Sequence, residues 1–182
     1  MTTATPLRPS AAAALLRRAA SALAHPLLPE DYLALLDPLA GRELRARVEA
    51  VLPETADAAT VVLRPGRTWP AHRPGQYLRL GVDVDGVRQW RAYSITSAPQ
   101  AADGCVRITV KAIPDGTVSN HVVRHLTRGA IVRLAEPEGE FVLPDVLPAK
   151  VLFLTGGSGI TPVMGMLRSH RLADAVVLHS AL

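Results

Sequence analysis

Cysteine is almost absent from this chain of 182 residues, since Cys105 is its only one. A single thiol excludes an internal disulfide, a cysteine-rich zinc site and a ferredoxin-type iron–sulfur cluster held by this chain alone. Long hydrophobic runs are missing as well, because no uncharged apolar stretch is long enough to span a bilayer. We therefore expect a cytoplasmic protein without a transmembrane segment, or one held at the membrane periphery by its partner.

Aromatic residues make up 4% of the chain, and the basic residues behind its net charge of +4 form no dense patch interleaved with them. Nucleic-acid binding therefore finds no support. The histidines show no metal-ligand spacing with carboxylates or cysteine, and His121 and His125, four apart, lack further ligands. We predict no metal on this chain. The composition, 48% hydrophobic and 20% charged, is ordinary for one globular domain or two small ones.

Residues 1–41 have a pattern of their own. Ala11 to Ala24 is rich in Ala and Leu and predicts a short helix, and Leu27 to Leu39 predicts another between prolines. Arg17 and Arg18 lie inside the first apolar run, whereas a signal peptide carries its basic residues before the run. We interpret the segment as a helical N-terminal extension, packed on the main domain or frayed. Contact with a membrane surface or a partner is the alternative.

From Gly41 onward the hydrophobic pattern changes to period two, which is typical of half-buried strands. Turns rich in Gly, Pro and Asp separate the strands, and one helix is predicted at Ser119 to Leu126. Short strands at this spacing predict a small antiparallel barrel or sandwich. The predicted strands are Leu44–Ala50, Thr60–Arg64, Gln76–Val82, Val87–Ile95, Cys105–Lys111, Ile131–Leu134 and Phe141–Leu143.

A second change of pattern follows Pro148. Val151 to Leu154 is a continuous apolar run, typical of a strand buried on both faces of a parallel sheet, and Ala175 to His179 predicts another such strand. Between them a glycine turn leads into a helix that reaches about residue 172. Thr161 suits the N-cap of this helix, and Pro162 suits its first position.

This order of strand, glycine turn, helix and strand is the opening of a doubly wound α/β nucleotide-binding lobe, here over residues 148–182. Two strands do not complete such a sheet, so we expect a fragment or a truncated gene product. One face of the two strands should then remain partly bare.

The stretch Arg91-Ala92-Tyr93-Ser94 carries the most chemistry. It lies in a predicted strand, which places Arg91 and Tyr93, two residues apart, on one face. The guanidinium can pair with a phosphate, the phenol ring can lie against a planar heterocycle, and the Ser94 hydroxyl can hydrogen-bond a ring nitrogen. The alternative is an ordinary strand, with its tyrosine in the core and its arginine reaching for solvent.

Two glycine-bearing turns follow this strand along the chain. Gly116 to Ser119 offers backbone N–H groups at a helix start, where the positive end of the helix dipole favours a pyrophosphate. Gly156 to Pro162 repeats the arrangement after an apolar strand. Either turn alone is compatible with mere packing, but the three motifs in this order favour a flat, phosphorylated ligand.

The residues that carry a family resemblance are Pro74-Gly75-Gln76-Tyr77, Arg91-Ala92-Tyr93-Ser94, Lys111, Gly116 to Ser119, Gly139 with Phe141, and Thr155 to Pro162. Together they resemble the ferredoxin–NADP reductase-like family of flavin oxidoreductases, over roughly residues 42–182. The run Leu27 to Tyr32 resembles, within that family, actinobacterial oxidoreductases that feed electrons to fatty-acyl desaturases.

The resemblance implies a fold and a first cofactor. A six-stranded antiparallel Greek-key β-barrel, residues 42–147, would bind FAD rather than FMN. Arg91 would bind a flavin phosphate, Tyr93 would stack on the isoalloxazine, and Ser94 would hydrogen-bond near its N5. The other implied contacts are Ala92, the strand residues Thr109, Val110 and Lys111, and, for the pyrophosphate, Gly116, Thr117, Val118 and Ser119.

The resemblance also implies NAD(P)H as the electron donor. Tyr93, Ser94 and Thr161 would place its nicotinamide against the flavin as the catalytic set. The flavin would pass electrons singly to a ferredoxin-type iron–sulfur domain or protein, which would serve a membrane desaturase or an oxygenase. Because much of the nucleotide lobe is missing from these residues, the alternative is a flavin-binding fragment without turnover. The dinucleotide contacts would be Thr155, Gly156, Gly157, Gly159 and Thr161.

Overall fold

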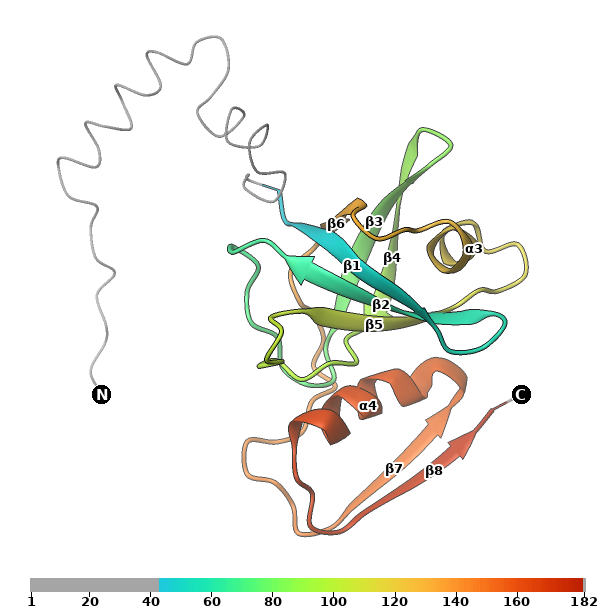
Figure 1. Cartoon of the computed structure of the whole chain (residues 1–182). Coiled ribbons are helices and arrows are strands. Elements are labelled where there is room, and N and C mark those ends of the chain that lie inside the picture. Colours follow the sequence, from blue (N-terminus) through green and yellow to red (C-terminus); the bar gives the residue numbers. More distant parts are fainter. Residues whose placement is uncertain (1–42, 182) are drawn as a thin grey trace, which may run out of the picture. The chain divides into compact units, whose positions relative to one another are not determined.

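Six antiparallel strands form the larger sheet of the structure, a computed structural model that describes residues 43–181 (Figure 1). Their order in the sheet is β4-β3-β6-β1-β2-β5, so that β6 lies between strands from earlier in the chain. The helices expected within residues 1–41 lie outside the described residues. The strands are β1 (Arg45–Pro53), β2 (Ala58–Pro65), β3 (Tyr77–Val84), β4 (Val87–Ser94), β5 (Val106–Lys111) and β6 (Ile131–Leu134).

The sheet curls into a barrel because its two outermost strands approach each other. Ile95, directly after β4, pairs with Ile108 of β5 across an isolated antiparallel bridge. Both side chains are fully buried in one core with Leu63, Leu80 and their neighbours. The six-stranded antiparallel barrel with Greek-key order is therefore confirmed. So is the alternation in β5, where Val106, Ile108 and Val110 are buried and the intervening residues face outward.

Two details of the predicted strands are wrong. The alternation expected through Ala50 breaks at Glu49, because Val48 pairs with Leu63 while Ala50 pairs with the adjacent Val62, which makes a β-bulge. Phe141–Leu143 is not a strand, and Phe141 is 62% exposed. Regular pairing near it stops at Glu138, whose one bridge is to Tyr77.

One helix covers the barrel beside β5 and β3. This helix, α3 (Thr117–Arg124), begins and ends two residues before the predicted bounds of Ser119 and Leu126. Val118 and Val122, one turn apart, are buried in the barrel core. The buried apolar face of α3 thus holds the start of the helix in place, directly after Gly116.

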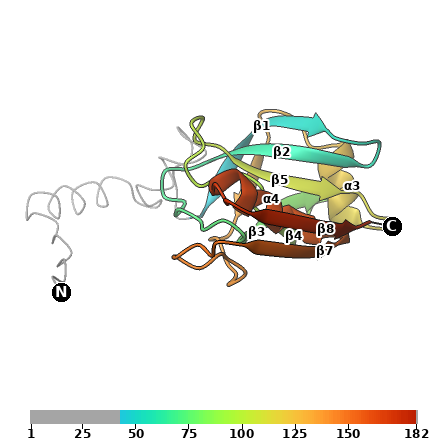
Figure 2. The same cartoon turned by 90° about the horizontal axis from the view of Figure 1, so that it is seen from below.

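The C-terminal part is a β–α–β unit. Strands β7 (Val151–Gly156) and β8 (Ala175–Ser180) are parallel, and they are joined by the short η1 (Gly157–Gly159) and by α4 (Ile160–Ser169). Figure 1 shows α4 between this strand pair and the barrel, where the helix contacts β4, and Figure 2 shows the strand pair from below. No helix among residues 43–181 has the length and apolar character to cross a bilayer.

The start and end of α4 differ from the prediction. Gly159 has helical dihedral angles and no side chain caps the helix, so Ile160 is its first residue and Thr161 is not the N-cap. Instead, the Thr161 hydroxyl donates to the Ser158 carbonyl oxygen at 2.7 Å. The helix ends at Ser169, three residues before the predicted end, since His170 is extended.

The β7–β8 pair is buried on one face only. Phe153 packs with Val163 and Met166 of α4 in a small second core. On the opposite face Leu154 is 70% exposed and Leu178 is 57% exposed. Burial of β7 on both faces is therefore wrong for the described residues, whereas the partly bare face is confirmed.

Candidate cofactor site

A cavity of about 410 Å³ opens between β4, the end of β5 and the start of α3. It brings together many of the residues singled out in the sequence, although they are up to 28 positions apart along the chain. Ile113, Pro114 and Asp115, which were not singled out, complete its wall. The predicted residues that line it are Arg91, Ala92, Tyr93, Lys111, Gly116, Thr117, Val118 and Ser119.

Arg91 presents an available guanidinium at this cavity. The side chain is exposed, and one of its nitrogens donates to the Trp90 carbonyl oxygen at 2.7 Å. Among the described residues no carboxylate pairs with it. An arginine with spare donors beside a cavity can bind a phosphate through two parallel hydrogen bonds.

Tyr93 lies two residues further along the same face of β4. Its ring is half-buried against the barrel core. Burial raises the pKa of its phenol, and the positive charge of Arg91 offsets this in part. The phenol is therefore neutral at physiological pH, which suits a ring that stacks on a planar ligand.

Lys111 forms an ion pair with Asp57, which lies in the turn just before β2. Its Nζ lies 3.6 Å from Oδ2 of Asp57, and the Asp57 carbonyl oxygen accepts from the N–H of Ala112 at 2.7 Å. A hydrogen bond from the Thr55 hydroxyl, and secondarily the charge of Lys111, lower the pKa of Asp57. The ion pair holds the ammonium beside the cavity.

The turn before α3 is shaped by its own side chains. Asp115 adopts a left-handed φ of 59°, and a Cβ added to Gly116 would lie 2.5 Å from both Ile113 and the Ser119 hydroxyl. The Ser119 hydroxyl donates to the Gly116 carbonyl oxygen at 3.1 Å, so it turns back on the loop. Any ligand contact of Ser119 would then come from its backbone.

Asn120 was missed at the sequence level. Its amide nitrogen donates to the carbonyl oxygens of Ile113 at 2.8 Å and of Gly116 at 2.9 Å. These two bonds brace both ends of the turn from the first coil of α3. The signal that could have identified it is an Asn just inside a helix that follows a glycine turn, since such a side chain readily bonds nearby backbone groups.

The start of α3 is open to an anion. No side chain caps it, and its first turn holds no acidic residue. The first N–H groups of a helix lack partners within the helix, and the dipole makes this end positive. The site therefore combines a guanidinium with spare donors, a neutral aromatic ring and a helix start without a side-chain cap.

Three residues predicted near the ring do not line the cavity. Ser94, at the end of β4, is half-buried and pairs with Tyr77. The Thr109 hydroxyl lies 2.9 Å from that of Thr60 on β2, on the outer face of the barrel. The Val110 side chain is in the core, 1% exposed, so only its backbone can meet a ligand.

The second glycine turn lies at the carboxyl ends of β7 and β8. A Cβ added to Gly156 or Gly157 would meet no atom within 4 Å, so packing does not demand glycine at either position. The Thr155 hydroxyl lies 2.9 Å from Nδ1 of His179, and both residues line a separate cavity of about 530 Å³. Ligands of open α/β sheets bind at such strand ends.

Residues 68–143 match the family model described as an oxidoreductase FAD-binding domain. The NADPH oxidoreductase of Mycobacterium tuberculosis (strain ATCC 25618 / H37Rv) is 50% identical over 174 residues, which cover 91% of this chain and 46% of the relative. The glycine betaine monooxygenase reductase subunit of Pseudomonas aeruginosa (strain UCBPP-PA14) is 40% identical over 113 residues, 60% of this chain and 31% of the relative. This chain thus spans less than half the length of these two proteins.

A solved structure supports the same assignment. The flavohem-like FAD/NAD-binding domain of nitric oxide dioxygenase from Vibrio cholerae O1 biovar El Tor superposes with a TM-score of 0.68 at 25% identity. The match covers 77% of this chain and 63% of that one. Fold, cavity and matched sequence define an FAD-binding oxidoreductase domain. The barrel has the fold of ferredoxin–NADP reductases, the family that the motifs of this chain resemble.

The donor set fits FAD and does not suggest a metal. Cationic, aromatic and backbone N–H groups match the phosphates and the ring system of a flavin dinucleotide. Within residues 43–181, no group of three or more His, Cys, Asp or Glu side chains is placed to hold a metal ion.

Proposed function

We propose that this chain binds FAD between β4, β5 and α3 and passes reducing equivalents from NAD(P)H through it to a one-electron acceptor. The observation that carries the proposal is the meeting of Arg91, Tyr93 and the Gly116–Ser119 turn in one cavity of about 410 Å³. All three lie in the region that matches the FAD-binding family. A bound flavin supplies the chemistry that accepts a hydride and returns electrons one at a time.

In this proposal the residues of the chain bind FAD and orient its ring. Arg91 holds a phosphate of FAD through its spare donors, and the N–H groups at the start of α3 hold the pyrophosphate. Tyr93 covers one face of the ring as a neutral phenol. Ser94 follows it at the end of β4, outside the lining of the cavity, so its proposed hydrogen bond near the reacting nitrogen requires the ring to extend past Tyr93. The backbone of Thr109, Val110 and Lys111 borders the ring.

The second glycine turn takes the nicotinamide dinucleotide in this proposal. Gly156 and Gly157 leave space for a pyrophosphate to approach the backbone, as their open surroundings permit. Thr155, Gly159 and Thr161 complete the contact, and Thr161 helps to orient the nicotinamide.

The proposed acceptor is a ferredoxin-type iron–sulfur domain or protein that serves an oxygenase or a desaturase. The name of the Pseudomonas aeruginosa relative, a monooxygenase reductase subunit, supports an oxygenase system. The desaturase alternative rests on the motif Leu27 to Tyr32, which lies outside the described residues. A cytoplasmic or membrane-peripheral setting stays a prediction that cell fractionation tests.

The visible spectrum of the purified protein tests the proposal. We expect a yellow protein, or one that becomes yellow with added FAD, whose flavin band is bleached by NADH or NADPH without oxygen. Electron transfer is then followed by adding a ferredoxin and cytochrome c as the final acceptor. A protein that cannot be loaded with FAD would refute the proposal.

A second candidate function is flavin binding without turnover. The exposed apolar face of β7 and β8, where Leu152 is 59% exposed and Val176 is 50% exposed, favours it, since a working nucleotide lobe has both faces of its sheet covered. A yellow protein that neither NADH nor NADPH bleaches would support this candidate against the first.

A further inference from the structure

The corner Ile95–Ser97 follows directly after the flavin-site residues Tyr93 and Ser94. Its residues are closed off from solvent: Ile95 is 0% exposed, Thr96 is 1% and Ser97 is 3%. Thr96 and Ser97 are the least exposed polar residues among those described. Their buried carbonyl and N–H groups need partners, and these partners come from two sides.

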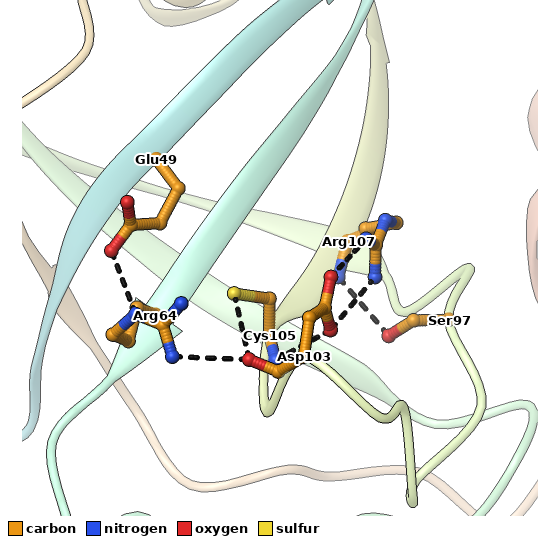
Figure 3. Close-up of polar contacts among 6 residues, drawn as sticks. All are labelled: Glu49, Arg64, Ser97, Asp103, Cys105 and Arg107. Atoms are coloured by element: carbon orange, nitrogen blue, oxygen red, sulfur yellow. Dashed lines mark hydrogen bonds and ion pairs between the residues drawn. The ribbon is translucent and has the colours of Figure 1, made fainter.

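The first side is β5. The Thr96 N–H donates to the Arg107 carbonyl oxygen at 2.8 Å, and the Arg107 N–H donates to the Ser97 hydroxyl oxygen at 3.1 Å. The Arg107 guanidinium is itself held by the Asp103 carboxylate, and Arg64 donates to the Asp103 carbonyl oxygen at 3.0 Å (Figure 3). These contacts fix the corner to the barrel wall.

The second side is α4. A Cβ added to Gly165 would lie 2.5 Å from the Ile95 carbonyl oxygen, so the helix approaches this backbone more closely than any side chain allows. One turn later, Nη1 of Arg168 donates to the Thr96 carbonyl oxygen at 2.8 Å. Between them, Met166 is 1% exposed, and its methyl group would lie 2.5 Å from a Cβ added to Gly75. One hydrogen bond and two packing contacts thus hold α4 against the corner and the adjacent Gly75.

The same helix carries the second glycine turn at its other end. Thr161 precedes Gly165 by four residues, a separation of about 6 Å along a helix axis. Because a helix is stiff over this length, any shift of α4 against the corner moves the glycine turn relative to β4. Hydride transfer is sensitive to such shifts, since a displacement of about 1 Å can change a rate about 100-fold.

We propose that Gly165 and Arg168 are positioning residues that set the distance between the nicotinamide-binding turn and the flavin strand. The proposal rests on the proposed function. It assigns neither residue a contact with FAD or with the dinucleotide, because both act through the backbone of Ile95 and Thr96.

The test compares Arg168→Met, Arg168→Lys and the control Arg171→Met in the full chain. Arg171 is exposed just beyond the end of α4, so its loss leaves the corner intact. FAD affinity is measured by titration, and the rate of flavin reduction is measured in a single turnover at saturating NADH and NADPH. We expect Arg168→Met to lower this rate about tenfold or more while FAD affinity changes less than about twofold. Lys, which keeps a donor, should restore part of the rate.

An unchanged reduction rate in Arg168→Met would overturn the proposal, as would an equal loss in FAD affinity, which indicates a structural role alone. If the unaltered chain binds FAD but neither nucleotide reduces it, the proposed function fails separately. In that case amide hydrogen exchange tests the positioning contact. The contact is supported if Arg168→Met speeds exchange in α4 but not in β1 and β2, and if Arg171→Met changes exchange in none of them. Unchanged exchange in α4 refutes it.

Discussion

Tyr93 and Arg91 share one face of β4, but they serve the proposed flavin site in different ways. Replacing Tyr93 with Ala removes the stacking surface and leaves the strand backbone in place. The lost stacking costs about 1 kcal/mol beyond the lost area, or about a fivefold rise in the dissociation constant of FAD. Fluorescence titration of the apoprotein measures this rise, and a shift of the flavin absorption band should accompany it. Unchanged affinity and spectrum would place the ring elsewhere.

Arg91→Ala should act through charge. A hydrogen-bonded ion pair with phosphate is worth about 1.5–3 kcal/mol, so the dissociation constant of FAD should rise tenfold or more. Arg88→Ala is the matched control, because Arg88 lies on the same strand but pairs with Asp83 at 2.9 Å, outside the cavity. The salt dependence of FAD binding should weaken in Arg91→Ala only. Equal effects of the two substitutions would contradict the assignment.

His72 gives the fold a pH dependence of its own. It is 5% exposed, its Nε2 lies 3.2 Å from the Ser97 carbonyl oxygen, and burial lowers its pKa below the ordinary 6.5. The unfolded chain then binds a proton more readily than the native one, so stability is lost as pH falls below about 6.5. We expect the urea midpoint to drop between pH 7.5 and pH 5.5, and to drop less in His72→Gln. Parallel curves would show that other groups control this range.

Single residues also show where sequence reasoning reaches its limit. Arg91, Tyr93 and Gly116 were predictable because their chemistry is visible in short motifs. Arg168 was not, since its bond to the Thr96 carbonyl spans 72 positions and uses a backbone acceptor present at every residue. Asn120 was overlooked for a different reason: its partners are close in sequence, but helix periodicity does not reveal side chains that fold back on a turn.

At the scale of elements, the turn before α3 makes the most direct prediction. Gly116→Ala would place a methyl group 2.5 Å from side-chain atoms of Ile113 and Ser119, so both side chains must shift and the Ser119 hydrogen bond that shapes the start of α3 is disturbed. We expect FAD to bind at least about tenfold more weakly, because the helix N–H groups lose their alignment. Gly156→Ala is the control, since its added Cβ meets nothing within 4 Å. Similar losses in both variants would argue against the pyrophosphate site at α3.

Strand alternation was enough to locate β1 to β6, but not their irregularities. The bulge at Glu49 depends on the pairing register with β2, which the alternation of β1 alone does not contain. Phe141–Leu143 had an apolar pattern but no partner strand. The start of α4 was misplaced because Gly159 adopts helical dihedral angles, which removed Thr161 from the capping position. Each of these errors concerns a strand register, a strand partner or a helix boundary that depends on contacts in space and not on the local sequence.

At the scale of the whole described unit, the sheet order could not be obtained from periodicity. The placement of β6 between β3 and β1 is a property of topology, and only the family resemblance implied it. The residues that line the proposed FAD cavity all come from the barrel and α3, between Arg91 and Ser119. By contrast, the second core beneath β7 is small, with Phe153, Val163 and Met166 as its buried members.

Because the cavity lining comes from the barrel and α3 alone, the effect of removing residues 148–182 can be predicted. Every group that lines the cavity stays, so the dissociation constant of FAD should change by less than about threefold, or about 0.7 kcal/mol. Stability should nevertheless fall, because Ile95 and Gly75 lose the cover of α4 and the Thr96 carbonyl oxygen loses Arg168 as its donor.

FAD titration and urea unfolding of the shortened and full chains measure the two effects side by side. Arg168→Met in the full chain is the control that isolates the single hydrogen bond from the rest of the lost cover. If the shortened chain loses FAD binding in proportion to its stability, the barrel does not hold the cofactor site by itself. The β7–α4–β8 unit would then be part of that site.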